Sequence, residues 1–566
     1  MSNPTPRYWT IAGRVLVLSV LFLFLAAQLC YLLLDYEALA DWYQSLGPFY
    51  RQSYWTSEFF TPAVKQSGNR YVALGLVLTT AIIIYVLKSP KPLSIKFREP
   101  RANPERKPLA ILMLSLTALW VWGSIGLAPA YDELFTTERI STGQLFVASS
   151  YYMIPNNHVF FSFLLGLCWR ICSFLQIDPL WVGRIISLLS LVGIGGLLFV
   201  WLRKVIASPW LRLSSVLLLS SQLGIWGFAT QARGYLLLLL FSWLAVCSLE
   251  KMLEREKKNP SASLVFVIFS ALAFITVPVY LYVFAGIVMY WSFQQIRRKT
   301  FNRSAIRILG STLMLTYLLY LPILAFSGLS ALTGNRYVDG LQNNVDLGIT
   351  GFASDWLPTL PYYFQYALSL WPPEHWILLV LLIALCPIWL YLQGGKRERM
   401  LAGLLLCVWI STVLITIFLR EVPAARMLLW QLQATFLVFW LAILQVLKRV
   451  RFGTVAGIGI ALFLALINFK YLPAKFEASL LYYYPVADTH KALQEMVDSL
   501  PDQSLVRCSD EAFFPAYLIR KRGLPLDSDS YTHYIRRESE SDWPKTIDSF
   551  ELVLQVQDYL IFEQKE

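Results

Sequence analysis

Long apolar runs recur along the whole chain, and polar residues are concentrated in the shorter segments between them. A helix that crosses a bilayer needs about 20 consecutive apolar residues. By this measure the sequence predicts about thirteen transmembrane helices, near residues 15–34, 71–87, 109–128, 181–202, 211–228, 236–250, 263–277, 279–293, 306–327, 375–392, 400–419, 427–447 and 453–472. Pro278 favours two helices within 263–293, because a proline inside a helix removes a backbone hydrogen bond. We therefore expect an α-helical polytopic membrane protein.

One further apolar segment, 158–177, is predicted to lie along the membrane surface, since it carries Arg170 and follows a polar loop. With this topology, 27 of the 48 Lys and Arg residues fall in loops on one face, 11 on the other face and 10 in the C-terminal tail. Cytoplasmic loops are enriched in these residues. The N-terminus is therefore predicted to be cytoplasmic and the tail extracytoplasmic. The first apolar run lacks a small-x-small cleavage site, so we expect it to remain as an anchor.

Composition agrees with a membrane protein: 57% of the 566 residues are hydrophobic and only 15% are charged. These values exclude a disordered chain, a collagen-like fibre and a coiled coil. The net charge of +12 is of the size that nucleic-acid-binding proteins carry. Because most of the bases fall on the predicted cytoplasmic face, the charge reports topology instead, and no nucleic-acid partner is expected. The seven cysteines lie mostly in apolar runs and predict neither a disulfide framework nor a metal set.

The predicted organisation has three parts. Residues 1–108 form a two-helix membrane extension with a basic cytoplasmic linker, 109–472 form the membrane core, and 473–566 form a small extracytoplasmic α/β region. In that last region, helices are predicted near 486–499 and 510–521, and the alternation in SFELVLQVQDYLIF predicts one strand. The aromatic residues of the outer loop 35–70 are expected to form an interfacial belt.

Candidate chemistry gathers in the outer loop that follows the third predicted span. Asp132 and Glu133 lie at a helix end beside apolar spans, where acidic residues are costly and often functional. A carboxylate there can act as a general base on a hydroxyl, or Asp132 can simply cap a helix. Asn156, Asn157 and His158 close the same loop; they suit a sugar or a phosphate, or can cap the segment 158–177.

The charge distribution disfavours bases on the outer face, and two of the arginines predicted there are of particular interest. Arg233 follows the fifth span and Arg426 opens a late helix, so both are candidate phosphate ligands. Arg233 can alternatively extend to lipid headgroups. The sequence contains no P-loop, GxGxxG, HExxH, paired CxxC or GxSxG motif, so nucleotide hydrolysis and zinc or serine hydrolysis have no support.

Five segments, taken in their order along the chain, resemble sequence motifs of the GT-C superfamily of glycosyltransferases. They are similar to the bacterial branch that includes protein O-mannosyltransferases and lipid A aminoarabinose transferases (glycosyltransferase family 39-like). The segments are YDELFT, PNNHVFFSFLLGLCWRI, LWVGRIISLLSL, TQARGYLLLL and PAARMLLWQLQ. The resemblance covers roughly 109–472 and implies a GT-C-like core of 11 helices, preceded by two extra ones.

The resemblance implies an inverting enzyme that transfers a sugar from a polyprenyl-phosphate donor to a hydroxyl of a lipid, glycan or protein on the outer face. It implies a protein of the bacterial plasma (inner) membrane, with Asp132 as base and Glu133 beside it. Because the leaving group is a lipid phosphate, it needs cations, and Arg233 and Arg426 are the candidates. Orientation of donor or acceptor would fall to Asn156, Asn157, His158 and Tyr235. Some relatives carry an acidic residue in the second outer loop, but here that place reads TQARGY, so a divalent metal is doubtful and no cofactor is expected.

Two other functions compete with this one. A polysaccharide polymerase or ligase acting on lipid-linked glycans would be expected to place its arginines in a large late outer loop, and 328–374 contains only Arg336. A transporter would be expected to have polar or broken helices at mid-membrane, whereas the predicted spans are nearly free of charge. The length of loop 328–374 suggests a functional segment, and we expect it to cover donor or acceptor.

Overall fold

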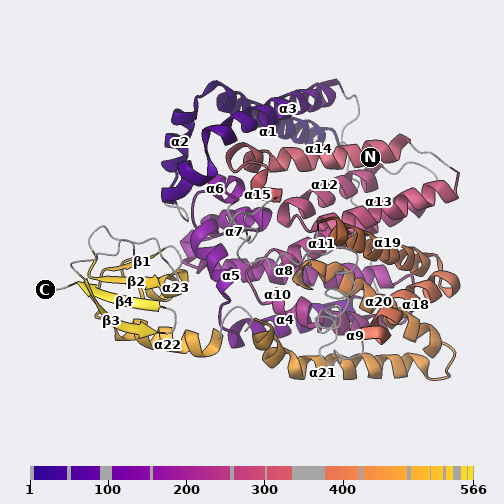
Figure 1. Cartoon of the computed structure of the whole chain (residues 1–566). Coiled ribbons are helices and arrows are strands. Elements are labelled where there is room, and N and C mark those ends of the chain that lie inside the picture. The colour runs from indigo at the N-terminus through magenta and orange to yellow at the C-terminus, as the bar shows by residue number, and fades with distance from the viewer. Residues whose placement is uncertain are drawn as a thin grey trace.

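The computed structural model describes residues 6–47, 52–88, 105–152, 157–254, 260–299, 303–333, 376–419, 423, 425–480, 486–509, 512–526, 531–538, 550–556 and 559–564. Within these ranges, nine helices are long and apolar enough to cross a membrane. They are α1 (Pro6–Leu33), α3 (Pro62–Lys88), α4 (Arg106–Gly126), α8 (Pro179–Leu202), α11 (Tyr235–Glu254), α14 (Arg303–Phe326), α19 (Lys396–Leu419), α20 (Leu429–Leu447) and α21 (Gly453–Leu480). The predicted fold class, an α-helical polytopic membrane protein with a small C-terminal sheet, is confirmed (Figure 1).

The predicted count of thirteen spans is not confirmed. Three of the remaining predicted spans are helices, namely α12 (Pro260–Thr276), α13 (Tyr280–Arg297) and α18 (Trp376–Gln393). The division of 263–293 at Pro278 is confirmed, because α12 ends before it and α13 begins after it. The predicted span 211–228 is wrong as one helix: the chain forms α9 (Pro209–Ser220) and α10 (Leu223–Ala229). At the break, the Ser221 hydroxyl donates to the carbonyl of Leu218 and accepts from Asn468, which provides polar partners outside a continuous helix.

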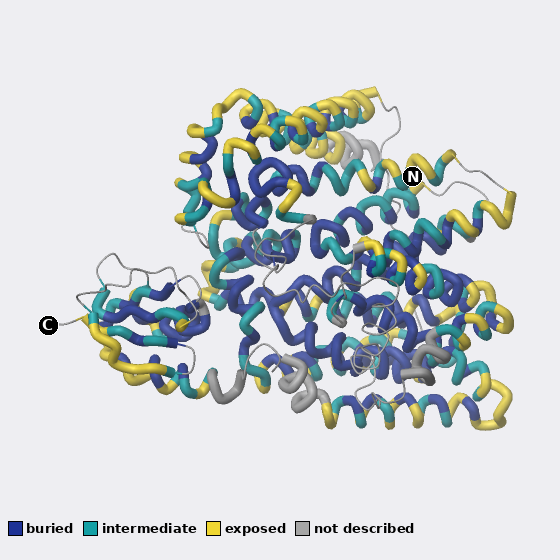
Figure 2. The backbone as a smooth tube through the Cα atoms, in the orientation of Figure 1, coloured by how far each residue is buried: buried dark blue, intermediate teal, exposed yellow. Residues whose placement is uncertain are grey.

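Burial separates an inner layer of helices from an outer one. In Figure 2, α8, α11 and α20 run through the dark-blue interior, while α1, α3 and α21 carry yellow, exposed positions. Exposed residues of the outer helices include Leu16, Leu23, Val77, Phe463 and Leu466. Apolar side chains on the outside of a helical bundle are stable when lipid surrounds it, because lipid tails are as apolar as leucine.

The N-terminal extension is fastened to the core by buried polar and aromatic contacts. Helix α3 packs against α1 and α14, and the Tyr31 hydroxyl of α1 donates to the carbonyl of Ala325 in α14 at 2.8 Å. The loop aromatics do not form only an interfacial belt, because Tyr43 and Trp55 are fully buried and stack with ring centroids 4.0 Å apart. Tyr43 also packs on Phe326 of α14. Part of the predicted belt is therefore the core that joins the extension to the rest of the protein.

The C-terminal region lies at one end of the helical bundle (Figure 1). It contains α22 (Val486–Ser499), α23 (Phe513–Arg522) and a four-stranded sheet of order β1-β2-β4-β3. The strands are β1 (Val506–Cys508), β2 (His533–Arg537), β3 (Phe550–Val556) and β4 (Tyr559–Gln564); β1 and β2 are parallel and the other pairs antiparallel. The two predicted helices are confirmed. The single predicted final strand is wrong, because that stretch forms the antiparallel pair β3 and β4, with Val556 opposite Tyr559.

Candidate active site

The loop after α4 forms a series of short helices at the end of the bundle that also carries the C-terminal region (Figure 1). These are α5 (Tyr131–Leu134), the π-helix η3 (Phe135–Ser141), α6 (Leu145–Ser150) and α7 (Val159–Ile171). π-Helical segments are rare in proteins, and those that occur are often found at functional sites. Helix α7 has 13 residues and spans about 20 Å at 1.5 Å per residue, too short to cross a bilayer of about 30 Å. Its length agrees with the predicted surface position.

The Glu133 carboxylate is fully buried and saturated with hydrogen bonds. It accepts from Arg184 of α8 through Nε at 2.8 Å and Nη2 at 3.0 Å. It also accepts from the backbone N–H groups of Ala232 at 2.7 Å and Ala130 at 3.2 Å. Arg184 in turn donates to the carbonyl of Ser124 in α4 at 2.6 Å. Glu133 therefore ties α5 to α4, α8 and the loop before α11. This geometry departs from the predicted catalytic pair and gives Glu133 a positioning role.

The neighbouring carboxylate, Asp132, is partly open: its side chain is 40% exposed. Its Oδ2 lies 3.4 Å from Nη2 of Arg233, whose side chain is only 1% exposed. Nη1 of Arg233 also donates to the main-chain carbonyl of Asp132 at 2.9 Å. Asp132 is the second residue of α5, whose N-cap is Ala130, so the capping alternative is wrong. The burial of Arg233 likewise excludes its extension to lipid headgroups.

The loop that carries Arg233 is held in a narrow space. The Gly234 N–H donates to Nδ1 of His158 at 2.9 Å, and the Ser187 hydroxyl donates to the carbonyl of Gln231 at 2.6 Å. A β-carbon on Gly234 would lie 2.9 Å from Cβ of His158, so only glycine permits this approach. The loop is thereby fixed with Arg233 directed at Asp132.

His158 is buried at the start of α7. Burial lowers its pKa well below the usual range, and the positive charges of Arg233 and Arg426 lower that pKa further. The ring is therefore neutral at pH 7, and because Nδ1 accepts a hydrogen bond, its proton is assigned to Nε2. The Tyr235 ring meets the imidazole edge-on at 4.5 Å between centroids and lies 5.6 Å from the Arg233 guanidinium carbon.

Five of the residues predicted from sequence thus belong to one neighbourhood: Asp132, His158, Arg233, Tyr235 and Arg426. Arg426 comes from the short 3₁₀ helix η8 (Ala425–Leu428), which directly precedes α20. It is half-buried, and its charge acts on His158. The neighbourhood combines one partly exposed carboxylate, two guanidinium groups and a neutral imidazole N–H.

Both the nitrogen and the oxygen of the Asn157 side chain are hydrogen-bonded to other groups of the protein. Its Nδ2 donates to the carbonyls of Ala148 at 3.2 Å and Tyr151 at 3.0 Å, while Oδ1 accepts from the Ser162 hydroxyl at 2.9 Å. These bonds fix the end of α6 to the start of α7, so Asn157 positions His158 without facing substrate. Asn156 lies outside the described residues, as does most of loop 328–374.

The C-terminal region is fastened to the loop that carries Asp132. Arg520 of α23 pairs with Glu138 at 2.7 Å and approaches Asp178 at 3.4 Å. Arg139 donates to the carbonyl of Ser509 at 2.9 Å. The Arg537 guanidinium carbon lies 5.7 Å from the ring centroid of Tyr131, the residue before Asp132. Sequence reasoning assigned none of these residues a role, because no local motif marks a contact between loop and tail.

Tyr517 of α23 also belongs to the contact between the C-terminal region and the loop of Asp132, and it lies near the buried pair of Glu133 and Arg184. Burial raises the pKa of its phenol to about 12, so it stays protonated at neutral pH, and its charge interactions include Arg184, Glu133 and Asp178. Burial also raises the pKa of the Glu138 carboxyl, although Arg520 beside it acts in the opposite direction. Among the described residues, no group of three or more His, Cys, Asp and Glu side chains could hold a metal ion.

No family model matches the sequence, and no curated protein matches it. Solved structures of three other proteins are similar in fold. ArnT from Cupriavidus metallidurans bound to undecaprenyl phosphate is 10% identical, with a TM-score of 0.48, over 80% of this chain and 97% of that one. Arabinosyltransferase EmbB from Mycobacterium smegmatis is 9% identical, with a TM-score of 0.40, over 80% of this chain and 44% of that one.

The archaeal oligosaccharyltransferase AglB from Archaeoglobus fulgidus, in complex with an inhibitory peptide and a dolichol-phosphate, is 11% identical. Its TM-score is 0.42, over 76% of this chain and 69% of that one. At these identities the likeness concerns the arrangement of helices alone. The roles of individual residues rest on the geometry described above.

Proposed function

We propose that this protein is an inverting membrane glycosyltransferase, which moves a sugar from a polyprenyl-phosphate donor to a hydroxyl acceptor on the outer face of the membrane. The observation that carries the proposal is the pairing of a partly exposed carboxylate, Asp132, with a buried guanidinium, Arg233, 3.4 Å away. The ordered motifs of the sequence support the class of donor, and the outer face follows from the predicted topology.

Asp132 is the proposed general base. An acceptor hydroxyl attacks the anomeric carbon from the face opposite the leaving group, and its proton passes to the Asp132 carboxylate as the new C–O bond forms. Asp132 is suited to this role because it remains accessible, whereas the four hydrogen bonds of Glu133 leave that carboxylate no free site for a substrate. One displacement by one base inverts the anomeric configuration.

The leaving group is a lipid phosphate, which departs with the electron pair of the broken bond between the anomeric carbon and the phosphate oxygen. Arg233 and Arg426 would stabilise its charge, and Nε2–H of the neutral His158 would supply a further donor. Since the leaving phosphate is already a weak base, it needs cations and not a second acid. The fixed loop of Gly234 supports this role, because it presents Arg233 without a need for rearrangement.

The decisive experiment is Asp132→Asn, assayed in membranes with radiolabelled sugars on undecaprenyl phosphate. We expect transfer to fall about 10²–10⁴-fold, the usual contribution of a general base, in protein that thermal unfolding shows to be folded. Asp41→Asn, on the exposed face of α2, is the matched control and should keep full activity. Undiminished transfer by Asp132→Asn would refute the assignment. Uptake of labelled sugar into vesicles without transfer to any acceptor would favour a transporter.

A further inference from the structure

A second site is suggested by a cavity of about 690 Å³ at the opposite end of the helical bundle. It is lined by the ends of α11, α13, α18 and α19. Helix α11 connects the two places: Tyr235 at its start packs on His158, and Glu250 near its end lines the cavity. Fifteen residues of helix separate them by about 22 Å. The predicted topology places this cavity on the cytoplasmic face.

The lining of the cavity is strongly basic. Five of its twelve lining residues are Arg or Lys, and one is acidic, namely Arg297, Arg298, Lys396, Arg397, Arg399 and Glu250. Glu250 is already occupied: it accepts from Arg397, and from Nε1 of Trp201 at 3.0 Å. Four positive charges therefore face one space without an acidic partner in the lining. Like charges held together repel, and an anion between them would relieve that repulsion.

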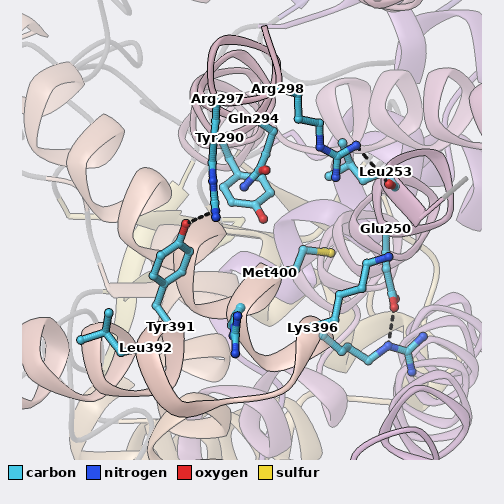
Figure 3. A pocket seen from close by; sticks show the side chains of 12 residues that line it. Glu250, Leu253, Tyr290, Gln294, Arg297, Arg298, Tyr391, Leu392, Lys396 and Met400 are labelled. Carbon is cyan, nitrogen blue, oxygen red and sulfur yellow. Dashed lines mark hydrogen bonds and ion pairs between the residues drawn. The ribbon is translucent and has the colours of Figure 1, made fainter. Parts of the chain in front are cut away.

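Two of these bases are aimed by contacts with neighbouring helices (Figure 3). Nη1 of Arg297 donates to the Tyr391 hydroxyl at 2.9 Å, joining α13 to α18. Nη1 of Arg298 donates to the carbonyl of Leu253 at 3.4 Å, at the end of α11. Both guanidinium groups keep further N–H donors for a ligand, since each has five.

The cavity also adjoins an apolar surface that suits a lipid tail. Leu385, Ile388 and Leu392 are exposed and follow one face of α18, and Leu392 itself lines the cavity. Phe293 and Ile296 of α13 are exposed as well. Charged groups at the end of an apolar stripe match the two parts of an amphiphile. Free phosphate would satisfy the charges but would not use the stripe.

We propose that this basic cavity binds the phosphate headgroup of an anionic membrane lipid, with an acyl chain along the stripe on α18. Basic pockets between membrane helices on the cytoplasmic side bind lipid headgroups in this way. The proposal is independent of the glycosyltransferase function, since the cavity and the candidate active site occupy opposite ends of the bundle.

The test is native mass spectrometry of the full-length, delipidated protein with added phosphatidylglycerol or phosphatidylcholine. The triple variant Arg297→Gln, Arg298→Gln, Lys396→Gln removes three cavity bases and spares Arg397, which holds Glu250. The matched control is Lys448→Gln, Arg449→Gln, Arg451→Gln, which removes three exposed bases at the turn between α20 and α21. Helix α20 packs on α18, and Gln445 near its end donates to Glu398 of α19, so this turn lies at the same end of the bundle.

We expect retention of phosphatidylglycerol over phosphatidylcholine by the unmodified protein, and a loss of at least about tenfold in the cavity variant, because each base near an anionic lipid adds to the attraction. The control variant should retain the lipid, and both variants should elute as monodisperse protein. Equal loss in the two variants would overturn the proposal, since it would indicate general surface charge. Displacement of phosphatidylglycerol by millimolar inorganic phosphate would overturn the lipid assignment in favour of a free-phosphate site.

Discussion

Two carboxylates adjacent in the chain occupy opposite surroundings. Glu133 is buried, pairs with Arg184 through two hydrogen bonds and accepts two backbone N–H groups. Asp132 is partly exposed and meets Arg233 at 3.4 Å. The buried carboxylate joins neighbouring elements of the candidate site, and the other carboxylate remains partly accessible to solvent. Burial and saturation, more than residue type, therefore separate a structural acid from a candidate base.

The largest expected effect on stability comes from removal of the buried Glu133 carboxylate. Glu133→Gln leaves Arg184 charged and without its partner, which costs about 3–5 kcal/mol when one member of a buried pair is removed. We expect a matching fall in the free energy of unfolding, measured by denaturant titration in detergent. Asp132→Asn should cost less, because the Asp132 carboxylate is 40% exposed and Arg233 keeps its hydrogen bond to the Asp132 main-chain carbonyl. Equal stability of the two variants would show that the two carboxylates contribute equally to folding.

A loss of similar size, but in rate, is expected on the open side. Arg233→Gln removes a fixed cation from the leaving phosphate, and transfer should fall about 10²–10³-fold. Arg233→Lys should recover only part of this rate, because an ammonium lacks the planar fork of a guanidinium. The matched control is Arg170→Gln at the far end of α7, which should keep its rate. Equal losses in the two Gln variants would show that Arg233 acts only through general charge.

Parts of this site could be predicted from sequence, because they depend on local features. Asp132, Arg233 and His158 were marked by polar chemistry beside apolar spans, and the structure gathers them. The pairing of Glu133 with Arg184, 51 residues later, could not be predicted, since a single sequence does not state which distant charges meet. The contact of Arg520 with Glu138 spans 382 residues and poses the same problem.

Element boundaries show the same division between local and distant information. Pro278 marked a helix break correctly, because a proline acts on its own helix. The break at Ser221 was missed, since its polar partner Asn468 comes from a distant helix. The sequence predicts that spans exist more readily than it predicts their number. Apolar helices of 17 or 18 residues, such as α12 and α13, lie near the minimum length for crossing a bilayer.

A smaller effect is expected from pH, and it concerns His158. The pKa of the folded imidazole lies well below the usual range, chiefly because it is buried. The unfolded chain binds a proton near pH 6.5 and the folded chain does not, so stability is lost as pH falls below about 6.5, by at most 1.4 kcal/mol per pH unit. In His158→Asn, whose Oδ1 can replace Nδ1 as acceptor, that part of the pH dependence should vanish. An unchanged pH profile of unfolding in this variant would contradict a buried, neutral His158.

The smallest expected effect concerns the contact between the C-terminal region and the loop of Asp132. The Arg520 side chain is 36% exposed, so its pair with Glu138 contributes about 1 kcal/mol or less after screening by solvent. Arg520→Gln should therefore leave the global unfolding free energy nearly unchanged but raise the rate of limited proteolysis within the tail. A double-mutant cycle with Glu138→Gln isolates the pair, and a coupling of zero would show that Tyr517 and Arg139 hold the region without it. The result bears on the comparison of Glu133 with Asp132, because Glu138 is intermediate between them. Its own carboxylate is buried, whereas its partner Arg520 is 36% exposed.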